Sequence, residues 1–208
     1  VYLVAAGKAA WQMAHAARAC LQDNFCGGVV VTKYGHVNGE IADVACFEGG
    51  HPVPDENSLR GTDAALALTE DLTESDTVVF LLSGGGSALF EKPLLPLAEL
   101  QDVTNQLLAA GADIVEINTI RKRLSAVKGG RFARHCAPAQ VFAVVLSDIL
   151  GDPLDMIASG PAYPDSSSCA QALDIAKRYG LHLSERAWAL LAQETPKTLE
   201  NVETQITG

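Results

Sequence analysis

The most constraining feature of this sequence is an alternation of short, wholly apolar runs with longer segments of helical periodicity. The apolar runs predict strands at residues 1–6, 28–32, 44–47, 77–82 and 141–146, and the periodic segments predict helices at residues 8–22, 55–72, 97–110, 113–127 and 169–179. Strands that are apolar throughout are typical of parallel sheets covered on both faces. We therefore expect the α/β class, with a Rossmann-like, doubly wound, mainly parallel sheet and helices on both faces. Ligands of such folds bind in the loops at the carboxyl ends of the strands.

Length and composition favour one large folded domain. Apolar residues make up 48% of the 208 residues and charged residues 19%, which suits a packed core and excludes a disordered chain. We expect this domain to span residues 1–195, and the polar residues 196–208 to form a linker towards a second domain that the chain lacks. The chain begins inside a strand-like run at Val1, so we also expect residues to be missing before it.

The net charge limits the kinds of binding partner to be expected, and the cysteine content indicates the cellular compartment. The net charge of −10 argues against nucleic acid and anionic membranes as partners, and no apolar run approaches the roughly 20 residues of a membrane span. The five cysteines are widely spaced, without a CxxC pair or a Cys/His metal pattern, which predicts reduced and mostly buried thiols. Such cysteine usage is typical of a cytoplasmic protein.

One segment departs from the acidic average. Residues 117–147 contain no Asp or Glu, although six of the chain's fifteen basic residues lie there. These six are Arg121, Lys122, Arg123, Lys128, Arg131 and Arg134. Such a concentration indicates either a local anion site or a solvated basic helix face.

The first candidate for ligand chemistry is Lys8. Gly7 permits a tight turn after the first predicted strand, and Lys8 follows it in the first turn of the next helix. A cation at that position opposes the helix dipole, at a cost of roughly 0.3–1 kcal/mol. A bound anion would reverse the sign, because the backbone N–H groups and the ammonium would both contact it. The alternative is an exposed lysine that extends into water.

The second candidate is a glycine-rich loop that follows the predicted strand 77–82. It consists of Ser83, Gly84, Gly85, Gly86 and Ser87. Glycines allow a ligand to approach the backbone N–H groups closely, and the two serines add hydroxyl donors. The loop is not a Walker A motif, and Leu89 stands where a GxGxxG fingerprint requires its third glycine. These features predict a phosphate-binding loop of another kind.

The third candidate is the predicted helix 113–127. One stripe on this helix is apolar and consists of Ile117, Ile120, Leu124 and Val127. A second stripe beside it is polar and consists of Asn118, Arg121, Ser125 and Lys128. A polar stripe that borders a buried face lies at the lip of a cleft, where an arginine fork and a lysine could bind a carboxylate or phosphate. The alternative is an ordinary amphipathic helix.

The fourth candidate is Asp148, which comes directly after the predicted strand 141–146 and its serine. A carboxylate at that edge of the sheet can hold Mg²⁺ or accept the proton of an attacking hydroxyl. The alternative is a helix cap or a turn residue. His51, in a proline-braced loop, is interpreted as structural because no serine or cysteine nucleophile motif accompanies it.

Five stretches, in sequence order, resemble a known family. They are GKAAWQMA, GGHPVPDE, LLSGGGSAL, EINTIRKRLSAVKGGRFA and LSDILGDPLDMIASGPAYPD, and they run from Gly7 to Asp165. Together they resemble the type II glycerate kinases, which phosphorylate D-glycerate with ATP. Members of that family have a Rossmann-like large domain followed by a second α/β domain, and their substrates bind between the two. The resemblance implies that this chain is the large domain and lacks the C-terminal one.

The resemblance also implies roles for the candidate residues. Lys8 matches the family's active-site lysine, and the glycine-rich loop would bind phosphate. Asn118, Arg121 and Lys128 would reach the nucleotide phosphates or the glycerate carboxylate. Asp148 would act as a metal ligand or as the base, with ATP and Mg²⁺ as cofactors. The implied reaction moves the γ-phosphoryl group of ATP to a hydroxyl of D-glycerate, and 2-phosphoglycerate is the expected product.

Two other functions stay open at the level of the sequence. A hydroxypyruvate reductase would need a dinucleotide fingerprint with an acidic residue roughly 20 positions further on, which neither glycine-containing turn supplies. A non-enzymatic module that binds sugar phosphates or organic acids would explain the glycine-rich loop and the basic stripe without Asp148. In the family, a second-domain arginine completes the site, so the resemblance implies that these 208 residues alone are inactive.

Overall fold

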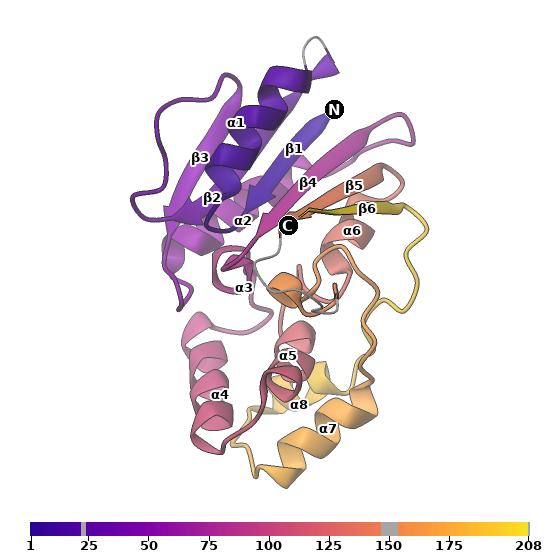
Figure 1. Ribbon diagram of the computed structural model, residues 1–208. Coiled ribbons are helices and arrows are strands. Elements are labelled where there is room, and N and C mark those ends of the chain that lie inside the picture. Colours follow the sequence, from indigo (N-terminus) through magenta and orange to yellow (C-terminus); the bar gives the residue numbers. More distant parts are fainter. Residues whose placement is uncertain (22–23, 147–153, 208) are drawn as a thin grey trace.

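A six-stranded parallel sheet organises the molecule. The computed structural model describes residues 1–21, 24–146 and 154–207. Within them the strand order is β3-β2-β1-β4-β5-β6, and all neighbouring strands run parallel (Figure 1). The strands are β1 (Tyr2–Ala6), β2 (Gly27–Lys33), β3 (Val44–Gly49), β4 (Thr77–Ser83), β5 (Gln140–Leu146) and β6 (Val202–Thr207). The predicted α/β class with a Rossmann-like sheet is confirmed.

Helices cover both faces of this sheet, as predicted. Helix α1 (Ala10–Leu21) covers one face, whereas α2 (Glu56–Leu68) and α6 (Arg131–Cys136) cover the other. The side chains of β1 alternate accordingly, because Leu3 packs with α1 and Val4 packs in the core that contains Phe132 of α6. The central strands β1 and β4 are apolar along most of their length because each face of the sheet has its own layer of helices.

A second group of helices forms a lobe of its own beyond the carboxyl ends of the strands (Figure 1). It contains α4 (Leu97–Ala109), α5 (Ile114–Arg123), α7 (Cys169–Arg178) and α8 (Glu185–Leu191), which share a separate apolar core. A four-residue helix, α3 (Gly86–Leu89), lies between β4 and this lobe. The sequence predicted three of the lobe's helices but assigned all helices to the sheet. Amphipathic periodicity shows that a helix has a buried face without showing what covers it.

The predicted helix 113–127 is shorter than expected. Asp113 caps α5 in a capping box with Glu116, but the helix ends at Arg123. Beyond it the backbone pairs with another segment, since the N–H of Leu94 donates to the Leu124 carbonyl (2.8 Å) and that of Ala126 donates to the Lys92 carbonyl (2.8 Å). These long-range hydrogen bonds replace the helical ones, so the polar stripe does not continue on one helix to Lys128.

The C-terminal segment also differs from the expected linker. Residues Val202–Thr207 form β6, which pairs with β5 along its whole length. The sheet therefore extends beyond residue 195, and the polar character of this segment reflects its place at the edge, where most of its side chains are exposed.

The structure bears on the expectations about the cysteines and about membrane-spanning segments. All five cysteines are free, but Cys136 alone is buried, while Cys20 and Cys26 are exposed. The expectation of mostly buried thiols is therefore wrong. Among the described residues, no helix has both the length and the apolar character needed to cross a bilayer.

Candidate functional site

The strand order reverses between β1 and β4, and the two predicted ligand loops meet there. The chain leaves β1 towards β2 on one side and returns to β4 on the other, so the loops after these strands diverge at a topological switch point. The N–H of Lys8 donates to the Gly84 carbonyl (2.8 Å), and the N–H of Ala9 donates to Ser83 Oγ (3.0 Å). The structure thus brings the first two candidates together. We call the loops 7–9 and 83–87 the switch-point site.

Gly7 makes this junction possible. Its φ of +123° disfavours any residue with a side chain, and a Cβ there would lie 2.5 Å from the Ser83 carbonyl oxygen. The Gly7 carbonyl also accepts a hydrogen bond from the buried hydroxyl of Thr32 in β2 (2.9 Å). Ser83 is itself buried, so its hydroxyl holds the two loops together in this structure.

Lys8 and His51 converge on the glycine-rich loop. A Cβ at Gly85 would lie 3.0 Å from His51 Cδ2 and 3.2 Å from Lys8 Cγ, so both side chains line the same stretch of backbone. The Lys8 side chain is exposed, while His51 is half-buried. Burial lowers the pKa of His51, and the charges of Lys8 and Lys33 lower it further, so both effects favour the neutral imidazole. The sequence suggested a structural role for His51, and the structure places it beside the candidate lysine.

Two residues of the polar stripe, Arg121 and Lys128, support the glycine-rich loop through hydrogen bonds to backbone carbonyls. Lys128 Nζ donates to the carbonyls of Ser87 (2.9 Å) and Phe90 (3.0 Å), and an Arg121 Nη donates to the same Ser87 carbonyl (3.0 Å). Both cations also contact the buried carboxylate of Glu91, at 3.5 and 3.4 Å. Lys128 is fully buried, so the structure shows it supporting the loop, and its direct contact with a ligand stays a prediction.

Desolvation controls the charge of Lys128. Burial lowers the pKa of its ammonium to about 8, although the neighbouring Glu91 carboxylate acts in the opposite direction. Arg121 is more accessible, with 14% of its side chain exposed, so it alone of these two cations borders solvent.

Ser159 is a residue of the site that sequence reasoning missed. Its buried hydroxyl donates to Asn118 Oδ1 (2.9 Å) and lies 3.4 Å from the hydroxyl of Ser87. Ala158, Ser159 and Gly160 all have positive φ, at 51°, 61° and 62°. This strained turn is held because Gly129 and Gly130 donate to the carbonyls of residues 159 and 160 (3.0 and 2.8 Å). Strain of this kind at common residues leaves no signal in the sequence.

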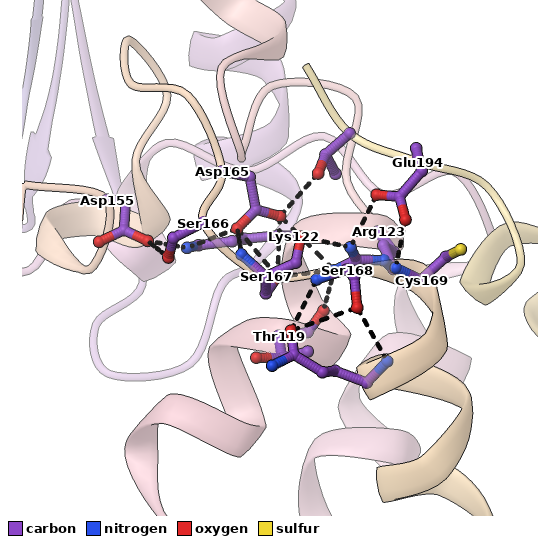
Figure 2. A network of polar contacts seen from close by, with 12 residues as sticks. Thr119, Lys122, Arg123, Asp155, Asp165, Ser166, Ser167, Ser168, Cys169 and Glu194 are labelled. Atoms are coloured by element: carbon purple, nitrogen blue, oxygen red, sulfur yellow. Dashed lines mark hydrogen bonds and ion pairs between the residues drawn. The ribbon is translucent and has the colours of Figure 1, made fainter. Parts of the chain in front are cut away.

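Two further cations of the basic segment form a buried ion-pair cluster (Figure 2). Lys122 Nζ contacts Asp155 (3.0 Å) and Asp165 (3.1 Å), and Arg123 contacts Asp165 (3.5 Å). Lys122 and Arg123 are 1% and 0% exposed, so they serve neither an anion site nor a solvated helix face. Asp155 and Asp165 are the partners of these two cations.

The charge state of Asp165 fits this arrangement. Burial alone would raise its pKa, but hydrogen bonds from Thr195 (2.7 Å) and Ser167 and the charge of Lys122 outweigh that effect. The pKa of Asp165 therefore lies below its ordinary value, and the carboxylate stays ionised beside its two cations.

Asp148, the candidate metal ligand or base, lies outside the described residues, and its role stays a prediction. Within residues 1–21, 24–146 and 154–207, no three His, Cys, Asp or Glu side chains gather in a way that could hold a metal ion. The described part of the site therefore supplies cations and backbone donors, which suit an anionic ligand.

Proteins similar to this chain carry two activity names, glycerate kinase and hydroxypyruvate reductase. The family described as "Domain of unknown function (DUF4147)" matches residues 1–192, so the chain belongs to it. The D-glycerate 2-kinase of Thermotoga maritima is 57% identical over 210 residues, which cover 100% of this chain and 50% of that protein. The glycerate 2-kinase of Pyrococcus horikoshii is 43% identical over 183 residues, which cover 87% of this chain and 41% of that protein. A protein of Agrobacterium vitis that is provisionally named a hydroxypyruvate reductase is 44% identical over 202 residues, which cover 95% and 46%.

Solved structures agree with these relatives. The crystal structure of a glycerate kinase from Thermotoga maritima has a TM-score of 0.96 and 56% identity, over 99% of this chain and 50% of that chain. A crystal structure of a Pyrococcus horikoshii protein has a TM-score of 0.91 and 38% identity, over 99% of this chain and 49% of that chain. The chain thus spans half or less of the length of each of these relatives.

Proposed function

We propose that this member of the family forms one half of a D-glycerate kinase, which transfers the γ-phosphoryl group of ATP to a hydroxyl of D-glycerate and yields 2-phosphoglycerate. The observation that carries this proposal is the convergence of Lys8 and the glycine-rich loop at the switch point, in a chain that is 57% identical to a named D-glycerate 2-kinase. A second domain of the same protein would complete the site. The free cysteines fit a reducing compartment, so we include a cytoplasmic location in the proposal.

The residues of this chain would act mainly by position and charge. Phosphoryl transfer needs little covalent participation from the protein, because the charge of the moving group spreads over its oxygens. The backbone N–H groups of the glycine-rich loop would hold the phosphates, and the exposed ammonium of Lys8 would stabilise the charge that develops in the transition state. Arg121 and Lys128 would keep the loop in place through the Ser87 carbonyl, to which both donate at 3.0 and 2.9 Å.

Asp148 and Mg²⁺ complete the proposal. Mg²⁺ would neutralise phosphate charge when it is bound with the nucleotide. Asp148, which follows Leu146 by two positions in the sequence, would hold the ion or accept the proton of the glycerate hydroxyl. His51, beside Lys8, would be a further acceptor for that proton.

A reductase is the competing enzymatic function, because one relative carries that name. The sequence favours phosphate chemistry over nicotinamide binding, since the loop after β1 contains the single glycine Gly7 and the loop after β4 departs from GxGxxG at Leu89. Binding of a nicotinamide dinucleotide with consumption of hydroxypyruvate would revive the reductase.

The test is a coupled assay of ADP release with D-glycerate and Mg-ATP. It compares this chain with a protein extended through the second half that the relatives contain. We expect turnover from the extended protein and none from this chain. Folded extended protein without turnover, together with tight binding of a small organic phosphate, would replace the kinase with a binding module.

A further inference from the structure

A small apolar pocket lies beside the switch-point site, and none of the residue roles in the proposed phosphoryl transfer uses it. It lies between the loop 52–54, after β3, and the helix α4, and it has a volume of about 320 Å³. Residues 52–54 line one side, Leu100 and Leu108 of α4 line the other, and the side chain of Arg121 reaches it from α5. Val53 and Leu108 are 56% and 59% exposed, so apolar surface is open to solvent at this place.

The pocket adjoins the glycine-rich loop in two ways. Arg121 lines the pocket and also donates to the Ser87 carbonyl (3.0 Å), so one residue contacts both places. On the other side, Pro52 lines the pocket and directly follows His51, whose ring lies against Gly85 and Lys8. A ligand with phosphates on the glycine-rich loop could therefore extend into the pocket past Arg121.

The lining favours a flat, mainly apolar ring with polar edges. Proline and leucine side chains supply the walls, while Gln101, Thr104 and Asn105 supply polar groups. Gln101 Nε2 donates to the Pro54 carbonyl (3.2 Å), which ties both walls together. Arg121 Nε is buried and has no hydrogen-bond partner among the described residues. The planar guanidinium of an arginine also stacks well on aromatic rings.

The volume of the pocket matches one part of a nucleotide. Small-molecule sites usually measure about 300–1,000 Å³, so a volume of about 320 Å³ suits a heterocyclic base rather than a whole nucleotide. Glycerate fits poorly, because a three-carbon hydroxy acid has no apolar face to bury. A phosphate fits poorly as well, since the walls are apolar.

We propose that this pocket is the base subsite of the nucleotide, with the purine ring between the loop 52–54 and α4 and the phosphates on the glycine-rich loop. This inference rests on the proposed use of ATP. It assigns Arg121 to the border between base and phosphates, whereas the sequence placed Arg121 on the phosphates or the glycerate carboxylate.

The test fills the pocket with a side chain. Thr104 suits this purpose because its hydroxyl donates only to the carbonyl of Leu100 in the same helix (2.9 Å), so Thr104→Phe removes no contact between elements. Asn105→Phe, at an exposed position of the same lining, is the second variant if the first fails to fold. Val115→Phe, at a 56% exposed position outside the pocket, is the matched control.

Each protein is titrated calorimetrically with adenosine, Mg-ATP and inorganic tripolyphosphate. We expect Thr104→Phe to weaken adenosine and Mg-ATP by about tenfold or more and to leave tripolyphosphate within about twofold, while Val115→Phe changes none of them. Equal weakening of all three ligands, no weakening of any, or no binding of adenosine and Mg-ATP by the parent chain would overturn the inference.

The kinase assay separates this inference from the proposed function. If the extended protein releases ADP but Thr104→Phe leaves its KM for ATP unchanged, the base lies elsewhere and the kinase stands. If adenosine binds in the pocket but the extended protein shows no turnover, the base subsite stands and the kinase does not. If Thr104→Phe lowers the stability of the extended protein without changing its affinity for ATP, the pocket packs against the second domain. That result would overturn the base subsite.

Discussion

Two regions of this molecule carry lysines in opposite surroundings. At the switch-point site, Lys8 is exposed beside the glycine-rich loop. In the interior, Lys122 and Lys128 are 1% and 0% exposed and contact carboxylates at 3.0–3.5 Å. The sequence suggested anion binding for both regions. The structure separates them, because Lys122 and Lys128 pair with carboxylates, whereas the exposed Lys8 stays a candidate for ligand binding.

The energetics of the two regions explain the difference. Removing a cation from water costs several kcal/mol, and this cost is offset only when a partner charge and hydrogen bonds are well placed. Lys122 and Arg123 meet this condition through Asp155 and Asp165. Glu91 offsets the cost only in part for Lys128, whose pKa stays lowered to about 8. Lys8 stays hydrated, so its ammonium can contact a ligand without first leaving a buried partner.

The largest expected effect on stability comes from breaking the buried ion-pair cluster. Asp165→Asn removes the charge shared by Lys122 and Arg123, and we expect the free energy of unfolding to fall by about 3–5 kcal/mol. Urea unfolding followed by circular dichroism measures this change. A loss below about 1 kcal/mol, as for an exposed pair, would show that the cluster is not structural.

Gly7 offers a way to break the switch-point site without changing charge. Gly7→Ala places a Cβ 2.5 Å from the Ser83 carbonyl oxygen at a φ of +123°, so we expect a loss of about 2 kcal/mol from overpacking and backbone strain. Gly180→Ala, with a φ of +59° and no neighbouring atom of the described residues within 4 Å of its Cβ, is the matched control for strain without a clash. Equal losses in the two variants in urea unfolding would mean that close packing at Gly7 is unimportant.

The pKa of Lys128 sharpens the comparison through pH. Burial lowers this pKa from 10.5 to about 8, so between these values the unfolded chain binds a proton that the folded chain does not. Stability should therefore rise with pH in that window, by on the order of 1 kcal/mol per pH unit. Unfolding at pH 7.5, 8.5 and 9.5 measures the slope. Subtracting the slope of Lys128→Met isolates this residue, and an identical slope in the variant would contradict the account.

The smallest effect is expected for an exposed ion pair. Lys92 contacts Asp63 at 2.6 Å, but their side chains are 39% and 50% exposed. We expect Asp63→Asn to lower the unfolding free energy by less than about 1 kcal/mol, because water and salt screen the pair. A loss as large as that of Asp165→Asn would mean that burial does not distinguish the two kinds of ion pair.

Much of the fold could be predicted because its determinants are local. Apolar runs and amphipathic periods gave the strands β1 to β5 and five helices, and their alternation gave the class. The lobe of α4, α5, α7 and α8 was missed, since periodicity does not reveal which surface a helix packs against. The early end of α5 depends on hydrogen bonds from residues 92–94, which are distant in sequence.

The candidate site likewise contains residues that could be predicted from the sequence and residues that could not. Lys8 and the glycine-rich loop could be predicted together, because both follow strands whose carboxyl ends share one edge of the sheet. The pairing of Lys122 with Asp165 joins residues 43 positions apart, and no local pattern indicates it. Ser159 depends on a backbone conformation that neither Ala158 nor Ser159 suggests by residue type.

The central claim is that Lys8 serves the reaction while the buried cations serve the fold. The most direct measurement compares ADP release by the extended protein with and without Lys8→Ala, alongside urea unfolding of this chain with the same change. We expect kcat to fall by about 10²–10³-fold, while the unfolding free energy stays within about 0.5 kcal/mol of the parent value. Activity within a few-fold of the parent, or a stability loss as large as that of Asp165→Asn, would contradict the account.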